Sequence, residues 1–179
     1  MAAHSPAAFE YAAQHHDRVS QHIYVDDVVA ETFAPWRRLW QKQGQAEPML
    51  RTVLMRMVHI AETDAIARAE AEQPLLTSRR LGVEGIARTC IGFKGTEDHP
   101  TTRDINRVFQ GMSTSYHFWL DNGLALVGSQ EAVIRQRKEQ HQRLGHDIFC
   151  TNHHMGTMPP EPPLTSLQLF GSEVIPVFP

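Results

Sequence analysis

The sequence predicts an α/β fold built on a parallel sheet, and three observations lead to it. Segments rich in β-branched and apolar residues alternate with segments whose apolar residues recur at helical spacing. Capping or terminating residues frame most of the helical segments. The chain has 179 residues, 41% of them hydrophobic, which is enough for one domain with a sizeable core. Because strands that alternate with helices form βαβ units, the sheet should be parallel.

The first third of the chain predicts two strands, each preceded by a helix. Ser5 is a good N-cap for the first helix, and Pro6 suits its first position. Pro35 lies inside the second helical pattern and should kink it or begin a new helix, because proline lacks an amide hydrogen. In chain order, the predicted elements are a helix over 6–16, a strand over 18–25, a helix over 27–43 and a strand over 49–61.

The middle of the chain is predicted to be less regular. A helix over 63–72, rich in Ala, Glu and Arg, has little apolar area, so we expect most of it to face solvent. Glycines and prolines punctuate residues 74–122, which predicts an irregular excursion with short helices over about 103–110 and 113–121. Nothing marks a second domain, so residues 1–179 are expected to form one.

The last third returns to alternating strands and helices. Ser129 is the expected N-cap of one helix, and Gly145 its expected end. Leu167, Phe170 and Val174 should mark the buried face of the final helix. The predicted elements are a strand over 124–127, a helix over 130–144, a strand over 147–152 and a helix over 164–174.

Composition argues against several classes of partner. With 17 Lys and Arg against 20 Asp and Glu, no basic surplus favours a phosphate backbone, so we expect no nucleic acid. No stretch approaches the roughly 18 apolar residues of a membrane helix, so we expect no membrane. Cys90 and Cys150 form no CxxC motif, and the amino terminus does not resemble a signal peptide. We therefore expect a reduced, cytoplasmic protein.

Ser5 is the first candidate binding residue. A serine hydroxyl at a helix N-terminus, together with free backbone N–H groups and the helix dipole, can form an anion site. The same residue is also explained as a plain N-cap, which stabilises a helix by about 1 kcal/mol. Spacing alone leaves both interpretations open.

His153 and His154, which follow the last predicted strand, are candidate substrate-binding residues because α/β folds bind ligands at the carboxyl ends of strands. Adjacent strand residues point to opposite faces, so at most one of them should line a site. The alternative is a polar loop with one packed and one solvated imidazole. The 11 histidines include no HExxH spacing, so no metal site is expected. No GxSxG or phosphate-loop motif identifies a catalytic residue.

Several motifs together resemble the luciferase-like flavin-dependent monooxygenases. The most specific are VGSQEAV at 127–133, a turn into a helix, and LFGSEVIP at 169–176. The resemblance covers nearly the whole chain and is weakest over 74–115. Further similar segments are SPAAFEYAA at 5–13, LGHD at 144–147 and NHHMG at 152–156.

The resemblance implies a partial (β/α)8 TIM barrel, with parallel strands and about strands 6–8 of the barrel with their helices. The chain should begin just after the fifth strand, and the barrel should be incomplete. The family uses reduced FMN, or in some relatives the deazaflavin F420, with O2 to oxygenate a small organic substrate, and a flavin reductase is the expected partner. The family's catalytic histidine lies in the first half of the barrel, so the catalytic residues of this chain remain unknown.

The resemblance carries over one functional residue. Ser5 falls where the family has a serine that binds the flavin phosphate. A family hydroxyl three residues later is replaced by Ala8, which weakens the expected grip on phosphate. Arg137 stands where the family often has an apolar residue facing the barrel.

Two functions of different classes follow. The first is a flavin monooxygenase that acts once a complementing half-barrel or a second copy, as a homo-oligomer, completes it. The second is a non-catalytic half-barrel remnant or interaction module. The choice matters because flavin chemistry needs a dry, shaped pocket, whereas a half-barrel exposes its sheet edge and inner apolar layer.

Overall fold

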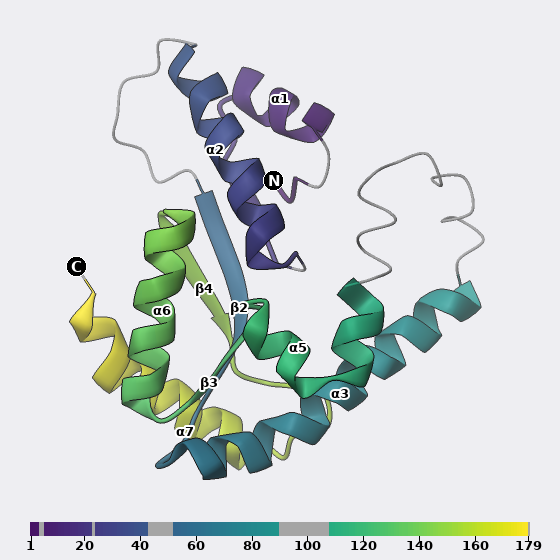
Figure 1. Cartoon of the computed structure of the whole chain (residues 1–179), viewed down its shortest axis with the longest axis vertical. Coiled ribbons are helices and arrows are strands. Elements are labelled where there is room, and N and C mark those ends of the chain that lie inside the picture. The colour runs from purple at the N-terminus through teal and green to yellow at the C-terminus, as the bar shows by residue number, and fades with distance from the viewer. Residues whose placement is uncertain (4–5, 23, 43–51, 90–107, 179) are drawn as a thin grey trace.

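A computed structural model describes residues 1–3, 6–22, 24–42, 52–89 and 108–178. The strands are β1 (Val19–Gln21), β2 (Thr52–Ile60), β3 (Ala125–Gly128) and β4 (Ile148–Asn152) (Figure 1). Residues 108–114 are also helical. The labelled helices are α1 (Pro6–Gln14), α2 (Asp26–Lys42), α3 (Asp64–Thr89), α5 (Tyr116–Asp121), α6 (Gln130–Leu144) and α7 (Glu161–Leu169).

The four strands form one parallel sheet around β2, as the sequence predicts. β1 pairs with the beginning of β2 and β3 with its end, while β4 pairs with residues 53–57. Val53 pairs with both β1 and β4, and Met57 pairs with both β3 and β4. A residue meets two strands only on opposite edges, so β1 and β3 share one edge of β2 and β4 takes the other. The sheet is open, which agrees with the predicted partial barrel.

Residues 1–3 extend the sheet beyond β1. Ala2 forms a parallel bridge with Ser20. The Ser20 N–H donates to the Met1 carbonyl at 2.8 Å, and the Ala3 N–H donates to the Ser20 carbonyl at 3.4 Å. The resemblance predicts that the chain begins just after a strand, but residues 1–3 pair with β1 in the manner of the last residues of that strand. Across the sheet the order is residues 1–3, β1, β2 and β4.

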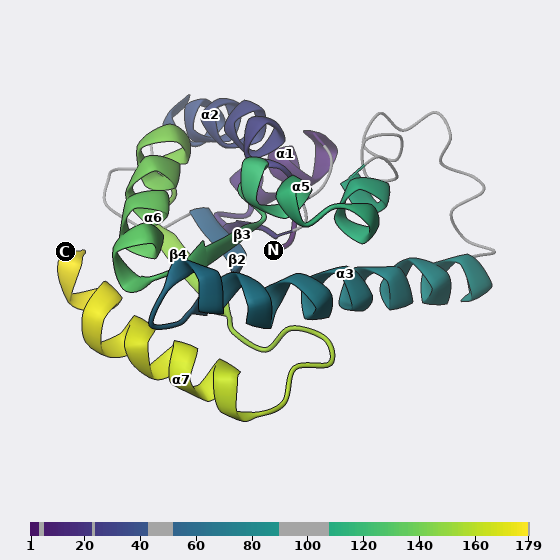
Figure 2. The ribbon, with the colours of Figure 1, turned by 60° about the horizontal axis from the view of Figure 1, so that its bottom comes forward.

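Four helices, α1, α2, α6 and α7, lie in an arc around one face of the sheet, which we call the outer face (Figure 2). On β2, Leu54, Arg56 and Val58 point to the outer face and are fully buried. The alternate residues Val53 and Met55 point to the opposite face and are only partly buried. The helices therefore cover one face of the sheet far better than the other.

The apolar core divides into three clusters. One joins α1, α2, β1 and β2 around Phe33, Trp36 and Leu54. A second joins the sheet to α6 and the C-terminal helix around Val58 and Phe170. The third packs α3, residues 108–114 and α5 against the carboxyl end of the sheet. Each cluster attaches helices to β2 or β3, which fixes the sheet as the centre of the fold.

Both ends of α6 follow the sequence prediction. The Ser129 side chain accepts a hydrogen bond from the Ala132 N–H, as an N-cap does. Gly145 ends the helix with a φ of 58°, a left-handed conformation that favours glycine. Arg37 of α2 donates to the carbonyls of Leu144 at 2.9 Å and of Gly145, so it satisfies acceptors that a helix end leaves free.

The excursion differs from the prediction at its start. α3 continues to Thr89 instead of ending near residue 72, so the first part of the predicted irregular segment is helical. Over the predicted span 63–72 most residues are exposed, as expected, while Ala67, Ala71 and, further along the helix, Leu75 are fully buried. Small alanines let the helix approach the sheet closely, so little apolar area per residue still makes a packed face. The predicted short helix over 103–110 lies partly outside the described residues.

Two further helices differ in detail. Pro35 does not divide α2, which runs as one helix with Pro35 on its exposed side and Phe33 and Trp36 buried. The final helix begins at Glu161, and a π-helical turn, Phe170–Val174, follows it. Leu167 is 51% exposed, contrary to prediction, because Ser166 takes the buried position.

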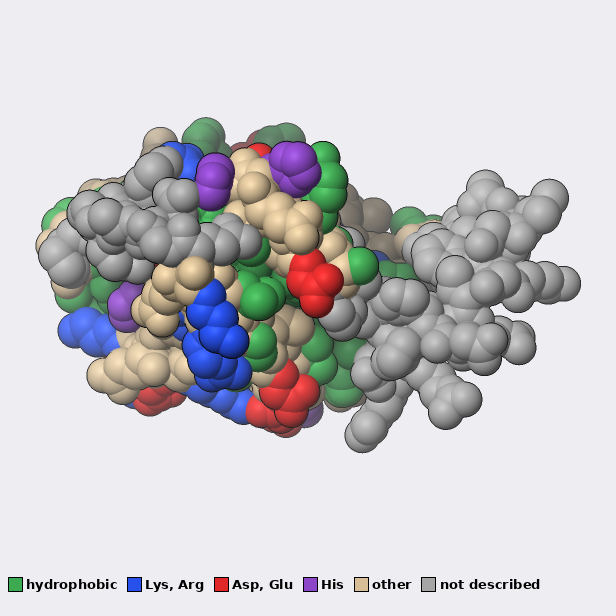
Figure 3. Space-filling view, turned by 90° about the horizontal axis from the view of Figure 1, so that it is seen from above, with side chains coloured by type: hydrophobic (Ala, Val, Ile, Leu, Met, Phe, Trp, Pro, Cys, Tyr) green, Lys and Arg blue, Asp and Glu red, His purple; other side chains and the backbone are tan. Residues whose placement is uncertain are grey.

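The charges on the surface are mixed in sign. Seen from above, Lys and Arg side chains lie close to Asp and Glu side chains (Figure 3). Exposed pairs such as Arg68–Glu72, at 3.1 Å, are typical of a solvated surface and stabilise it little. Within the described ranges, no helix combines the length and apolar character that crossing a bilayer requires.

Candidate functional site

The candidate site lies where residues 1–3, which precede α1 in sequence, pair with β1. The buried Gln21 side chain donates from Nε2 to the Ala3 carbonyl at 2.5 Å, which ties the first strand segment to β1. α1 then opens at Pro6 and runs nine residues. The first amides of a helix have no intrahelical partner and attract anions. Ser5 itself lies outside the described residues, so its side chain is not placed.

We call residues 1–3, Gln21 and the start of α1 the α1 corner. Gln21 adds an unused hydrogen-bond acceptor to it. Its Oε1 atom is buried and receives no hydrogen bond from the residues that the structure describes. A buried carbonyl without a donor costs free energy, and a ligand hydroxyl or amide could supply that donor. Sequence analysis missed this residue because a glutamine in a short strand carries no motif.

The two histidines after β4 are separated by the structure. His153 is buried, with Nδ1 at 2.7 Å from the Ser166 hydroxyl and Nε2 at 3.1 Å from the Thr151 hydroxyl. Burial, assisted by the nearby His59, lowers the pKa of His153 to about 4. His154 is exposed. The structure therefore has one packed and one solvated imidazole, which was the alternative interpretation. A substrate-binding role for either histidine remains a proposal.

Ser166 connects His153 to the sheet. Its hydroxyl also accepts a hydrogen bond from the Ile60 N–H at 2.8 Å. Because that oxygen already accepts one bond, its own proton can point to His153 Nδ1, which places the imidazole proton on Nε2 toward Thr151. This chain of contacts fixes α7 and the loop after β4 to the end of β2.

A His–Glu pair lies nearby that the sequence did not suggest. Nε2 of His59, at the end of β2, is 2.6 Å from the Glu70 carboxylate of α3. His59 is fully buried and its Nδ1 has no partner among the described residues. The carboxylate orients the imidazole, as such pairs do in active sites. The only sequence signal is a histidine near a strand end followed by a glutamate in the second turn of the next helix.

A buried polar cluster stands on the outer face. Arg56 donates to Asp26 at 2.9 Å, and Gln140 donates to Asp26 and to the Gly123 carbonyl at 2.8 Å. Burial lowers the pKa of Arg56, and the Asp26 carboxylate opposes that shift. The cluster joins β2 to α2, α6 and the turn before β3, so its role is architectural.

A cavity of about 320 Å³ borders this cluster. Its lining includes Asp26, Asp121, Glu139 and Arg143, and it also contacts Ala125 and Leu126 of β3. It opens among the helices of the outer face, away from α1 and from His153. We therefore separate it from the candidate site at the carboxyl end of the sheet. Elsewhere in the described ranges, His, Cys, Asp and Glu side chains form no group of three suited to a metal ion.

Arg137 is accommodated by aromatic rings. Its guanidinium lies 4.5 Å from the ring centre of Phe149 and 4.9 Å from that of Phe178. Burial lowers its pKa. Cation–π contacts of this kind compensate for a charge at a largely apolar position. The departure from the family pattern therefore leaves the packing of α6 intact.

Comparison with known proteins gives the family. The sequence profile described as luciferase-like monooxygenase matches residues 1–147. The chain belongs to the luciferase-like monooxygenase family. The match spans most of the chain, including the α1 corner and the sheet up to β3, and it confirms the resemblance seen in the motifs. A search of curated proteins gave no match.

Solved structures of this family share the fold. The monooxygenase RslO1 from Streptomyces bottropensis superposes with a TM-score of 0.71 at 18% identity, over 99% of this chain and 47% of its own. The oxygenating constituent of 3,6-diketocamphane monooxygenase from Pseudomonas putida, in complex with FMN, gives 0.64 at 15%, over 97% and 46%. EDTA monooxygenase from Chelativorans sp. BNC1 gives 0.62 at 14%, over 98% and 42%.

The chain spans less than half the length of each of these three proteins. The family member described here is accordingly a partial barrel, with one run of strands and their helices. Identities below 20% establish the shared fold and leave activity, substrate and cofactor to be argued from the residues.

The described residues fit the phosphate end of a flavin better than its ring. The start of α1 and the unsatisfied Gln21 Oε1 suit an anionic, hydroxyl-bearing group such as a ribityl phosphate. The partly exposed Val53 and Met55 suit one side of an apolar ring. A ring held in a dry pocket needs a second wall, which the described residues do not supply.

Proposed function

We propose that this chain is the C-terminal half of an FMN-dependent monooxygenase barrel, and that it is active on a small organic substrate once the barrel is completed. The observation that carries the proposal is the α1 corner, within a chain of the luciferase-like monooxygenase family. There residues 1–3, which the buried Gln21 ties to β1, lead in sequence through Ser5 into the N-terminus of α1.

Each residue has a definite part in this proposal. The free amides of α1 and the Ser5 hydroxyl would bind the phosphate, with Ala8 offering no second hydroxyl. Gln21 would position the segment that leads into α1 through the Ala3 carbonyl. Val53 and Met55 would shield one side of the ring from water.

Bound reduced flavin would supply the electrons with which O2 is activated and one oxygen atom is transferred to the substrate. A flavin reductase is the proposed source of reduced FMN. The deazaflavin F420 is the alternative cofactor, because its phosphate would meet the same corner. The exposed His154 and the buried His153 are the proposed substrate contacts, at the edge where such folds bind their ligands.

The competing proposal is a half-barrel without flavin chemistry. The partly exposed inner side of the sheet favours it, because water would reach a ring bound there. The two proposals differ in one measurable property, which is whether the folded chain binds flavin with a preference for the phosphorylated form.

The test is a fluorescence titration of the purified chain with FMN, riboflavin and F420. We expect FMN to bind more tightly than riboflavin, which lacks the phosphate. Ser5→Ala should weaken FMN binding about fivefold, the equivalent of about 1 kcal/mol, and leave riboflavin binding unchanged. Ser172→Ala, at an exposed serine, is the matched control. A folded chain that binds neither flavin would favour the non-catalytic half-barrel, and equal FMN affinity in Ser5→Ala would remove the role of Ser5.

A further inference from the structure

The inner face of the sheet is the largest unexplained feature of this chain. We define it by the side chains that alternate with the buried outer-face residues of β2 and β4: Val53, Met55, Met57, Ile148, Cys150 and Asn152. The pairs Val53–Ile148, Met55–Cys150 and Met57–Asn152 lie in register, so these side chains project together from one side. Cys150 is exposed and the others are partly exposed.

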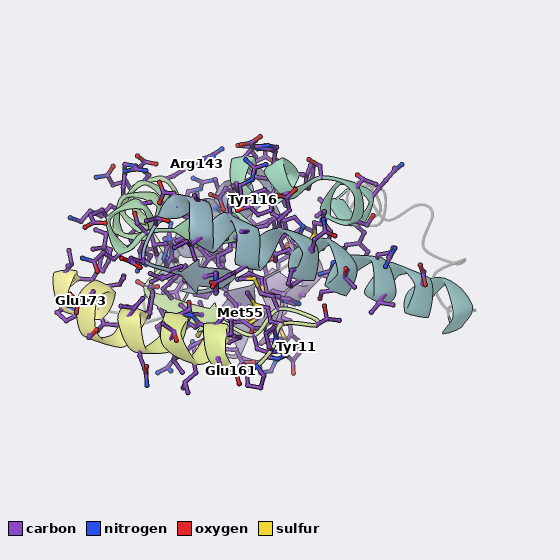
Figure 4. All side chains as sticks on the ribbon, turned by 90° about the horizontal axis from the view of Figure 1, so that it is seen from below. Tyr11, Met55, Tyr116, Arg143, Glu161 and Glu173 are labelled. Atoms are coloured by element: carbon purple, nitrogen blue, oxygen red, sulfur yellow. The ribbon has the colours of Figure 1, made fainter. Side chains whose placement is uncertain are left out.

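This exposure is unusual for a parallel sheet, whose strands are normally covered on both faces. Val53, Met55, Ile148 and Cys150 belong to none of the three apolar clusters, and α3 covers only the end near Met57. Met55 comes into view between α3 and α7 when the molecule is seen from below (Figure 4). Exposed apolar surface of this kind marks an interface.

The two edges of the sheet are open as well. In the described part of the chain, β4 pairs only with β2, and residues 1–3 pair only with β1. Each open edge is therefore formed by a segment that runs parallel to its neighbour. An edge strand left this way pairs readily with another chain.

We propose that the inner face binds a second copy of this chain, and that the two copies close one eight-stranded barrel. Across the middle of the sheet each copy supplies four parallel segments in the order residues 1–3, β1, β2 and β4, where residues 1–3 pair through one bridge and β3 lies beyond β1 on the same edge of β2. A (β/α)8 barrel needs eight parallel strands. A two-fold axis along the barrel would place β4 of one copy beside residues 1–3 of the other, twice, so that neither edge stays open.

The side chains suit this arrangement. In a closed barrel the inward residues form a packed core dominated by bulky apolar groups, and Val53, Met55 and Ile148 are of this kind. The inner face carries no charged residue among the six that define it. A net charge of only −3 per chain opposes association little. Because the proposed function also uses Val53 and Met55, the inference rests on the same face of the sheet, and dimer formation is measured without flavin so that the two proposals can fail separately.

Sedimentation velocity over a range of protein concentrations tests the proposal. We expect a dimer, and we expect Met55→Glu to weaken it by at least roughly 100-fold, because two unpaired carboxylates would enter the shared core. Leu167→Glu is the matched control, since Leu167 is 51% exposed on the outer side, and it should leave the dimer unchanged. Circular dichroism checks that Met55→Glu, whose side chain is partly exposed in the single chain, keeps its helices. Ile148→Glu, on the paired position of β4, serves as a second variant.

Thiol labelling identifies the face that is used. In a Cys90→Ser background, Cys150 should react freely at low concentration and become protected as the dimer forms. A chain that stays monomeric with a reactive Cys150 would overturn the proposal, as would a dimer that survives Met55→Glu with Cys150 still reactive. A different polypeptide that binds in equimolar amount and protects Cys150 would also overturn it, because the occupant would then be a complementing half and not a second copy.

Discussion

At the scale of single residues, the buried His146 makes the stability of the protein depend on pH. It is fully buried beside Phe149 and His141, and neither ring nitrogen has a hydrogen-bond partner among the described residues. Burial, followed by the charge of Arg137, lowers its pKa to about 3. The imidazole is therefore neutral in the folded protein at neutral pH.

This predicts a loss of stability in acid. Below the unfolded pKa of about 6.5, the unfolded chain takes up a proton that the folded chain does not, so the free energy of unfolding falls between about pH 6.5 and pH 3. At pH 5 the loss should be about 2 kcal/mol. The lowered pKa of His153, about 4, adds a loss of similar size, so urea unfolding at pH 7 and pH 5 should show that His146→Phe removes about half of the combined loss. His154→Gln, at an exposed histidine, should leave the loss of stability unchanged. If His146→Phe loses as much stability between pH 7 and pH 5 as the original chain, the loss comes from other groups.

Gln21 gives a second prediction at this scale. Gln21→Leu removes the donor to the Ala3 carbonyl and lets residues 1–3, which lead into α1, shift. We expect FMN affinity to fall about fivefold with riboflavin affinity unchanged, since the amide positions the phosphate site and not the ring. Gln136→Leu is the control, because Gln136 makes a similar bond to the Val127 carbonyl far from α1. Equal losses for both flavins would show that Gln21 supports the fold alone.

At the scale of elements, the turn between α5 and β3 depends on Gly123. Its φ is +68°, a left-handed conformation that side chains rarely adopt. A Cβ added there would come within 2.1 Å of the Asp26 carboxylate. The close approach allows Gln140 to reach both Asp26 and the Gly123 carbonyl. The turn, α2 and α6 are thus held by one contact that only glycine permits.

Gly123→Ala should therefore destabilise the protein by about 3 kcal/mol, through backbone strain and through disruption of the buried Asp26–Arg56 pair. Chemical unfolding monitored by circular dichroism measures the change. Gly171→Ala is the matched control, because nothing lies within 4 Å of a Cβ placed there. A loss below about 1 kcal/mol for Gly123→Ala would show that the cluster relaxes around the added methyl group.

Elements differed in how far the sequence could predict them. α6 was predictable to the residue, because Ser129 and Gly145 act through their own backbone within one turn. The buried side of α3 was not, because Ala67 and Ala71 become core residues only when another element approaches them. Leu167 was placed on the wrong face of the last helix for a similar reason: Ser166 turns inward to bond the Ile60 amide, 106 residues away in sequence.

At the scale of the whole molecule, the arc of helices covers one side of a four-stranded parallel sheet, while Val53, Met55 and Ile148 on the other side stay partly exposed. This asymmetry links the two proposals. A flavin bound at the α1 corner would extend over the inner face, and closing the barrel would bury both. The family match and the half-length superpositions fit this architecture, since each relative contains a second portion of comparable length within its own chain.

The sequence by itself determined the family, the parallel order of strands and helices, and the caps of α6, because these depend on local spacing and on short motifs. Tertiary structure alone decided that His153 is buried while His154 is exposed, that His59 meets Glu70, and that Gln21 holds the Ala3 carbonyl. The physical reason is distance along the chain. A cap or a turn is formed by neighbours, whereas a buried contact exists only after the sheet has brought remote residues together.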